Sequence, residues 1–181
     1  CSNTAVSTIL AKQTPLVHIT GSDSICVGGT TTLTPSAGGS WLTTNGAVAS
    51  ITSSGLVTGL TPGTSTFIYT SSENGCSSRA SFPVYVLKRP YVEITGDTSL
   101  CLGGSSTLFP SVGGTWTSSH PTIATVSNSG IVTGISPGNA AFTFVSDTTA
   151  CSSVTDSIDV NQHEGSVISG DNSICVGETS L

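Results

Sequence analysis

The sequence contains very few charged residues, and this scarcity excludes several classes of protein. Only 8% of the 181 residues are charged, and four Lys and Arg against ten Asp and Glu give a formal net charge of −6. Nucleic-acid binding needs a basic stripe along one face, which four scattered cations do not supply. Disorder through charge repulsion is excluded as well, because the mean hydropathy is positive, at +0.24, and apolar positions recur throughout the chain.

Methionine, long apolar runs and strong helix formers are also missing or scarce. Methionine is absent, aromatic residues make up 6% of the chain, and no run approaches the roughly 20 apolar residues of a membrane-spanning helix. Ala, Leu, Glu and Lys are outnumbered by Ser, Thr, Val and Gly, so long helices are not expected. What is present, including 21 Gly, indicates a soluble, β-rich protein.

The cysteines reveal an internal repeat of 75 residues. Cys26–Gly29 recurs as Cys101–Gly104, and the segment Gly55–Gly63 recurs as Gly130–Gly138. The gaps between successive cysteines alternate between about 25 and 50 residues, for Cys1, Cys26, Cys76, Cys101, Cys151 and Cys175. Such a period is the signature of a tandem array.

The repeat sets the expected domain boundaries. Residues 16–89 and 90–164 are each predicted to form one complete repeat. Residues 1–15 are expected to be the C-terminal strand of a preceding repeat, because Cys1 aligns with Cys76. Residues 165–181 are expected to open a following repeat.

Short apolar alternations separated by Gly, Pro, Ser and Asn predict an all-β sandwich in each repeat. Seven strands are expected in the first repeat, around Val17–Ile25, Thr30–Thr34, Trp41, Val48–Ile51, Leu56–Leu60, Phe67–Tyr69 and Phe82–Val86. The predicted fold is a tandem of immunoglobulin-like β-sandwich domains. An extended rod is expected because the short Leu87–Tyr91 linker contains Pro90, which restricts its own backbone and that of its neighbour.

Several motifs carry a resemblance to a known family. The succession of Trp41, Gly55–Gly59 and Pro62–Thr64 resembles the bacterial Ig-like group 2 domain. The elements around Cys26 and Cys76 resemble the long tandem repeats of Bacteroidetes cell-surface adhesins, including those of gliding motility. This resemblance implies export to the outer surface, association with the outer membrane, a filamentous shape and a role in attachment or gliding.

Strand directions bear on which cysteines pair. In an up-and-down sandwich, Cys26 and Cys76 lie at opposite ends, about 30 Å apart for a strand of about nine residues, whereas a disulfide needs Cα atoms within about 4.4–6.8 Å. We therefore predict that Cys26 pairs with Cys151 across two repeats. Partners outside this sequence are expected for Cys1, Cys76, Cys101 and Cys175. Pairing within each repeat and free thiols remain open alternatives, whereas zinc is disfavoured because no Cys-x-x-Cys spacing occurs.

No residue pattern points to catalysis, a cofactor or a resident metal. His18, His120 and His163 do not recur with the repeat, and no base accompanies the abundant hydroxyls as nucleophilic catalysis requires. Asp156 and Asp159 lie close in sequence and are interpreted as an exposed strand edge, with a calcium site as the alternative. We expect a protein that is not an enzyme and has neither catalytic nor metal-binding residues.

The large aromatic residues are interpreted as core. Trp41 and Trp116 occupy equivalent positions, as do Phe67 and Phe142, and buried aromatic anchors are typical of such sandwiches. The alternative is that the tryptophans are platforms on which sugars stack.

Three hydroxyls stand in an Asp-Ser/Thr context, at Ser24, Thr148 and Ser157. Their contexts resemble O-glycosylation sites of Bacteroidetes, although three-residue motifs arise easily by coincidence in a chain so rich in Ser and Thr.

The leading functional hypothesis is a structural stalk in a large secreted adhesin, with neighbouring repeats of the same chain as its partners. A second hypothesis is a module that binds glycans or surface proteins through the loops Thr43–Ala47 and Ser118–Thr122, which differ between the repeats. A third is a set of accessory repeats in a large exported enzyme. No nucleic-acid partner is expected, and no membrane span within this sequence.

Overall fold

The computed structural model describes residues 9–73 and 76–162, which contain strands, turns and loops but no helix. None of these residues therefore belongs to a helix long and apolar enough to cross a membrane. The chain divides into two compact units. The first comprises Cys1–Pro90 together with Val145–Ser153, and the second comprises Tyr91–Phe144 together with Val154–Leu181.

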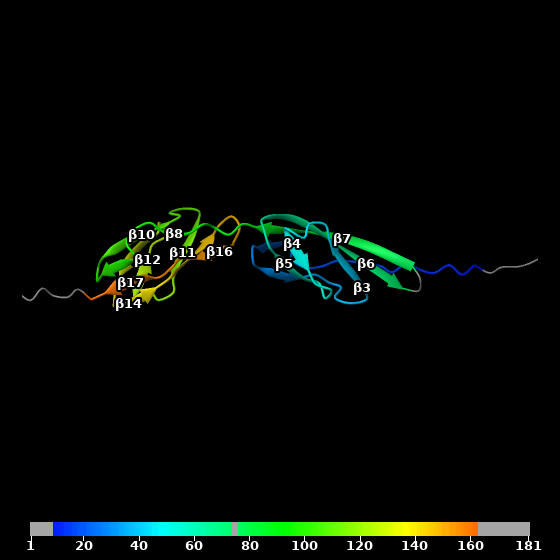
Figure 1. The fold of residues 1–181 in the computed structure, drawn as a ribbon, viewed down its shortest axis with the longest axis horizontal. Coiled ribbons are helices and arrows are strands. Elements are labelled where there is room, and N and C mark those ends of the chain that lie inside the picture. The colour runs from blue at the N-terminus through cyan, green and yellow to red at the C-terminus, as the bar shows by residue number, and fades with distance from the viewer. Residues whose placement is uncertain (1–8, 74–75, 163–181) are drawn as a thin grey trace, which may run out of the picture. The chain divides into compact units, whose positions relative to one another are not determined.

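The first repeat folds into two facing sheets (Figure 1). One sheet has the strand order β1-β7-β6-β3 and the other has the order β2-β5-β4. The strands are β1 Ser24–Cys26, β2 Thr30–Thr32, β3 Gly39–Thr43, β4 Ala49–Ile51, β5 Leu56–Gly59, β6 Gly63–Glu73 and β7 Cys76–Leu87. The described residues 9–15 contain no strand.

The long hairpin of β6 and β7 supplies much of the core of the first repeat. Its antiparallel register runs from Gly63 opposite Val86 to Glu73 opposite Cys76. Because side chains alternate between the faces of a strand, Phe67 on β6 and Val84 on β7 both point inward, and each is 0% exposed. They pack with buried Leu33, which directly follows β2, and with Val57 of β5 in the opposite sheet, and this apolar layer holds the two sheets together.

The second repeat contains the corresponding strands in three shorter sheets. The orders are β12-β13-β10-β8, β11-β15-β16 and β14-β17-β9. The strands are β8 Glu93–Ile94, β9 Ser99–Cys101, β10 Ser105–Phe109, β11 Gly114–Ser118, β12 Ala124–Val126, β13 Ile131–Gly134, β14 Gly138–Ala140, β15 Phe142–Ser146, β16 Ser152–Val154 and β17 Ile158–Asn161. The hairpin that is continuous in the first repeat is thus interrupted here at Ala141 and between Val154 and Ile158.

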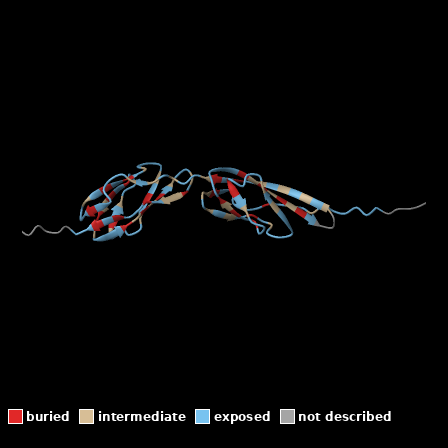
Figure 2. Ribbon diagram, in the orientation of Figure 1, coloured by how far each residue is buried: buried red, intermediate tan, exposed pale blue. Residues whose placement is uncertain are grey.

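The core of the second repeat uses equivalent positions. Phe142, Val132 and Ile158 are each 0% exposed. They belong to one apolar cluster that also contains Leu108 and Trp116. Figure 2 shows buried positions alternating with exposed ones along the strands of both repeats. Both repeats are therefore all-β immunoglobulin-like sandwiches.

A difference in register explains the single irregular cysteine gap. Ile25 lies opposite Val86 in the first repeat, and Leu100 lies opposite Val160 in the second. The first members of these pairs are 75 positions apart, but the second members are only 74 apart. The segment from Cys151 to Val160 is therefore one residue shorter than its counterpart from Cys76 to Val86, which shortens the spacing from Cys151 to Cys175.

A parallel strand pair fixes the positions of the cysteines in the first repeat. β1 runs parallel to β7, with Cys26 opposite Leu87 at the end of β7. Cys76 is the first residue of β7. The two cysteines are thus separated by the length of this 12-residue strand, or about 36 Å. This distance is far beyond the reach of a disulfide.

Candidate functional site

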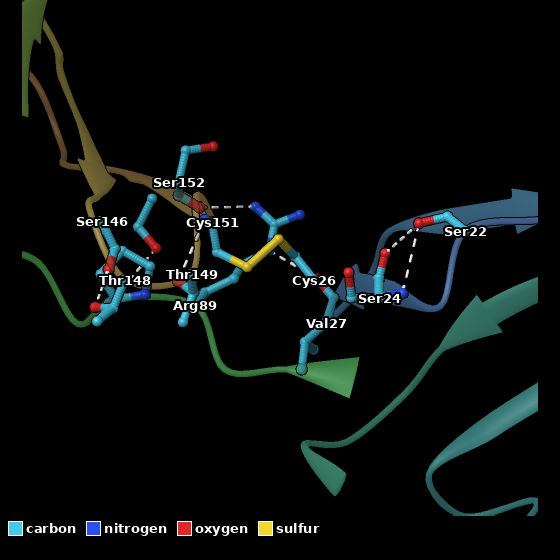
Figure 3. Close-up of a disulfide and its surroundings, with 12 residues drawn as sticks. Ser22, Ser24, Cys26, Val27, Arg89, Ser146, Thr148, Thr149, Cys151 and Ser152 are labelled. Atoms are coloured by element: carbon cyan, nitrogen blue, oxygen red, sulfur yellow. Dashed lines mark hydrogen bonds between the residues drawn. A yellow bond between two sulfur atoms is a disulfide. The ribbon is translucent and has the colours of Figure 1, made fainter. Parts of the chain in front are cut away.

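A disulfide joins Cys26 of the first repeat to Cys151 of the second. Its S–S distance is 2.05 Å, its Cα–Cα distance is 5.7 Å, and its two cysteines are 125 positions apart in the sequence. Figure 3 shows Cys26 at the end of β1 facing Cys151 in the loop that precedes β16. This is the pair that the strand directions predict, and neither cysteine bonds to another within its own repeat. We call this bond the junction disulfide.

The turn after β1 presents Cys26. Gly29 N–H donates to the Cys26 carbonyl at 2.8 Å, and Gly28 N–H donates to the Gly59 carbonyl at 2.8 Å. Gly28 adopts a φ of 76°, a left-handed conformation that glycine adopts without steric cost. Val27 N–H donates to the Leu87 carbonyl at 3.0 Å. We call the segment Cys26–Gly29 the Cys26 turn. Its backbone is hydrogen-bonded to β5 at Gly59 and to β7 at Leu87.

Cys151 lies at the end of a tight loop. Ser146 N–H donates to the Cys151 carbonyl at 3.0 Å, and Ala150 N–H donates to the Ser146 carbonyl at 2.9 Å. Ala150 has a φ of 56°. Among the described residues other than glycine, it alone has a positive φ. Cys151 is 0% exposed, so the junction disulfide is shielded from solvent on this side.

Arg89 connects the two sides of the junction disulfide, as Figure 3 shows. Its Nε donates to the Val27 carbonyl at 2.7 Å, and its Nη1 donates to the Ser152 carbonyl at 3.1 Å. The Ser153 hydroxyl donates to the Pro90 carbonyl at 2.6 Å. These bonds, with the disulfide, place the segment Val145–Ser153 in the same compact unit as the first repeat. Sequence reasoning missed Arg89, and the one signal was that the Leu87–Tyr91 linker holds two of the four Lys and Arg residues, Lys88 and Arg89.

Of the four remaining cysteines, two are free thiols and two lie outside the residues that the structure describes. Cys76 is free and half-buried, and Cys101 is free and exposed. The Sγ atom of Cys76 lies 4.0 Å from the carbonyl of Lys12, so the chain leading into the first repeat passes this hairpin end. Cys1 and Cys175 lie outside the described residues, and their partners remain a prediction.

The tryptophans occupy matched places in the two repeats. Trp41 is half-buried and its Nε1 donates to the Pro35 carbonyl at 3.1 Å, while Trp116 is 4% exposed and its Nε1 donates to the Pro110 carbonyl at 2.8 Å. The two bonded prolines both follow cis peptide bonds. Each indole also packs at about 5 Å on one ring, Tyr69 or Phe144. An indole covered in this way offers little face for a sugar to stack on.

The candidate titratable residues stay apart. His18 is exposed, and exposed His120 accepts or donates one hydrogen bond at Nδ1 with its neighbour Ser119 at 3.0 Å. Asp156 and Asp159 are exposed as well. In residues 9–73 and 76–162, no group of three or more His, Cys, Asp or Glu side chains is placed to hold a metal ion. His163 lies outside these residues.

One exposed tyrosine has a shifted pKa. The Tyr91 hydroxyl donates to a carboxylate oxygen of Glu93 at 3.0 Å. This hydrogen bond and the adjacent negative charge both favour the protonated phenol, so they raise the pKa of Tyr91 above its ordinary value of 10.0. The pair lies on the surface and resembles no catalytic arrangement.

The three hydroxyls with an Asp-Ser/Thr context are accessible. Ser24, Thr148 and Ser157 are all exposed. The Thr148 hydroxyl lies 3.1 Å from that of Ser146 in the loop before Cys151. Glycosylation at these positions stays a prediction.

Comparison with known families identifies part of the chain. Residues 106–158 match the bacterial Ig-like domain (group 2) family. The resemblance to that domain is therefore confirmed for this segment, which covers most of the second sandwich. No curated protein matches the chain.

Several solved structures have a similar fold, among them immunoglobulin domains of Sidekick-1 and titin. A fragment of intimin, solved in complex with the intimin-binding domain of its translocated receptor, is 20% identical, with 79% of this chain and 63% of the fragment covered and a TM-score of 0.46. Domains 4 and 5 of the S-layer protein SbsC are 23% identical, with coverages of 73% and 82% and a TM-score of 0.32. A SusE-like surface polysaccharide-binding protein of Bacteroides thetaiotaomicron is 11% identical, with coverages of 80% and 34% and a TM-score of 0.41. The chain thus spans less than two thirds of the intimin fragment and about one third of the SusE-like protein.

Proposed function

We propose that this chain is a tension-bearing stalk segment of a bacterial cell-surface protein, with adjacent sandwiches fastened by disulfides and without catalytic activity of its own. The observation that carries the proposal is the junction disulfide between Cys26 and Cys151. A bond between the turn end of one repeat and the hairpin end of the next adds nothing to a binding surface or an active site. It does restrict how far and how freely two neighbouring repeats can move.

The size of the closed loop supports a stabilising role. The junction disulfide closes a loop of 125 positions. In the chain-entropy treatment a loop of that length contributes about 5 kcal/mol, an upper figure because folded repeats already restrict the loop. Disulfides of this kind persist in oxidising surroundings outside the cytoplasm, which agrees with a location at the cell surface.

The finer proposal concerns the parent protein. The repeated motifs around Cys26, Trp41 and Cys76 resemble those of Bacteroidetes surface adhesins such as the gliding-motility adhesin SprB. We therefore assign the stalk to a secreted, outer-membrane-associated adhesin filament that serves attachment and gliding. In such a rod each complete repeat would span residues 16–89 or 90–164, with further repeats of the same kind as neighbours.

The stalk proposal is tested by measuring how freely the two repeats move. All cysteines outside the junction disulfide would first be replaced by Ser. Ser50 and Thr125, two equivalent exposed strand positions, would then each be replaced by a non-natural amino acid that carries a spin label through a non-reducible linkage. Pulsed electron resonance then gives the distribution of distances between the labels. We expect a narrow distribution with the disulfide intact, and a clearly broader one in the variant that also carries Cys26→Ser and Cys151→Ser.

A pair of labels within one repeat serves as the control. Labels at Ser50 and Ser81, both exposed in the first repeat, should give the same narrow distribution in both variants. Equal widths for the Ser50–Thr125 pair with and without the disulfide would contradict the stalk proposal, because the bond would then restrain nothing.

A further inference from the structure

The exposed Cys101 lies in a turn with the same backbone as the Cys26 turn. Gly103 has a φ of 76°, the same value as Gly28. Gly103 N–H donates to the Gly134 carbonyl at 2.9 Å, and Gly104 N–H donates to the Cys101 carbonyl at 2.9 Å. These bonds repeat those of the Cys26 turn at positions 75 residues later. We call this segment, Cys101–Gly104, the Cys101 turn.

The strand that carries Cys101 is also paired in the same way. β9 runs parallel to β17, with Cys101 opposite Asn161, just as Cys26 lies opposite Leu87. The difference is that the Cys26 sulfur is bonded to Cys151, whereas the Cys101 thiol is free and exposed. The Cys101 turn therefore has the backbone conformation of the Cys26 turn although its cysteine forms no disulfide.

Cys76 lies at the opposite end of its repeat from the turn cysteine Cys26. It aligns with Cys151 at the hairpin end of its repeat and is free. Its Sγ lies 4.0 Å from the Lys12 carbonyl, so the chain leading into the first repeat passes beside it. The corresponding chain leading into the second repeat passes beside the Cys151 loop, where Ser153 donates to the Pro90 carbonyl at 2.6 Å. Both hairpin cysteines thus lie beside the chain that enters their repeat.

We propose that the Cys101 turn is a docking site for the hairpin cysteine of another repeat of the same kind, so that two copies of this chain join through Cys101 of one and Cys76 of the other. The inference rests on the proposed stalk and names its partner. A turn cysteine and a hairpin cysteine lie at opposite ends of a sandwich, about 36 Å apart along a strand such as β7. Joining unlike ends is a head-to-tail contact, which does not close on itself and produces an open filament.

The chemistry needs an oxidant, for which a small-molecule disulfide such as oxidised glutathione suffices. The Cys101 thiolate attacks one glutathione sulfur, forms a mixed disulfide and expels a glutathione thiolate. The Cys76 thiolate of the second copy then attacks the Cys101 sulfur of that mixed disulfide and expels the second glutathione thiolate. The two thiol protons pass to the two glutathione thiolates, so one disulfide is formed and one is reduced.

The test uses the 181-residue chain in which Cys1 and Cys175 are replaced by Ser. In this background Cys76→Ser leaves only the Cys101 thiol free among the remaining cysteines, and Cys101→Ser leaves only Cys76. Each variant is incubated alone and in an equimolar mixture in a glutathione redox buffer, and dimers are measured by non-reducing electrophoresis. We expect several-fold more dimer in the mixture than in either variant alone, and a Cys76–Cys101 linked peptide after digestion with pepsin.

Dimer yields that are equal in all three samples would overturn the inference, because collisions between exposed thiols produce that result without a docking site. A mixture with no Cys76–Cys101 peptide would overturn it as well. The Cys26–Cys151 peptide is measured in the same digests. Its loss would count against the proposed stalk, whereas its recovery without the mixed dimer would count against the head-to-tail contact alone.

Discussion

Ala150 holds the loop before Cys151 in a left-handed conformation, with a φ of 56°. For a residue with a Cβ atom this conformation costs about 1–2 kcal/mol. The first repeat has Gly75 at the aligned position, one residue before Cys76. The strain at Ala150 thus lies next to the junction disulfide, where the tight Ser146–Cys151 loop imposes it.

We predict that Ala150→Gly raises the free energy of unfolding by about 0.5–1 kcal/mol, since the relief of the left-handed strain exceeds the entropy that glycine adds to the unfolded chain. Urea denaturation with the junction disulfide intact measures the change. The matched control is Ala47→Gly at an exposed position without positive φ, which should lower the same free energy by about 0.4–1 kcal/mol. Equal losses in both variants would show that Ala150 is unstrained.

Single residues were predictable where packing alone determines their place. Phe67 and Phe142 each stand two residues before another aromatic residue, Tyr69 or Phe144, as expected for one face of a strand, and both are fully buried. Arg89 was not predictable in the same way, because its partners are the carbonyls of Val27 and Ser152. Every residue offers a carbonyl, so the sequence holds no sign of which ones an arginine will reach.

At the scale of elements, Arg89 and the Cys151 loop act together. The guanidinium donates to carbonyls on both sides of the junction disulfide, so it favours the geometry in which the sulfurs are bonded. Hydrogen bonds from a charged donor are worth about 1.5–3 kcal/mol when buried, and less at an exposed position such as this one.

We predict that Arg89→Ala makes the junction disulfide easier to reduce, with an equilibrium constant for reduction by glutathione roughly fivefold higher, equivalent to about 1 kcal/mol. Alkylation of thiols after equilibration in glutathione buffers of graded potential gives that constant. Lys88→Ala removes the same charge from the neighbouring exposed residue and should leave the constant unchanged. If both variants shift it equally, general charge rather than the two hydrogen bonds sets the stability of the bond.

The positions and directions of the strands were largely predictable, and the departures have a physical cause. Turn residues such as Gly28 and Gly55 mark strand ends because they adopt a positive φ. The interruption of the second hairpin was not foreseen. Phe142 N–H bonds to the Thr155 hydroxyl, and Thr155 N–H bonds to the Phe142 carbonyl, whereas the aligned Phe67 lies opposite Phe82 in a regular ladder. One residue missing between Cys151 and Val160 shifts these pairings, and periodicity alone does not locate such a loss.

At the scale of the whole molecule, the pairing of Cys26 with Cys151 follows from strand direction. The order of strands places the two cysteines of a repeat at opposite ends, and the parallel pair of β1 and β7 maintains that separation. Sequence reasoning could predict this pair because it needs only the number and alternation of strands. The atomic contacts around the bond needed the structure.

A stapled pair of repeats should respond to tension in a characteristic way. When the chain is pulled from its ends, the junction disulfide carries the force past the 125 positions between its cysteines. Those positions include most of both sandwiches. The proposed stalk would therefore keep most of its length folded or locked under loads that extend an unlinked chain.

Single-molecule force spectroscopy tests this account most directly. The chain is folded under oxidising conditions, its free thiols are alkylated, and it is pulled by its ends before and after addition of a reductant. We predict that reduction releases a total additional extension of about 450 Å, the fully extended length of the 125 positions in the loop. A total of about 360 Å instead, from two 50-residue loops of about 180 Å each between Cys26 and Cys76 and between Cys101 and Cys151, would contradict the account.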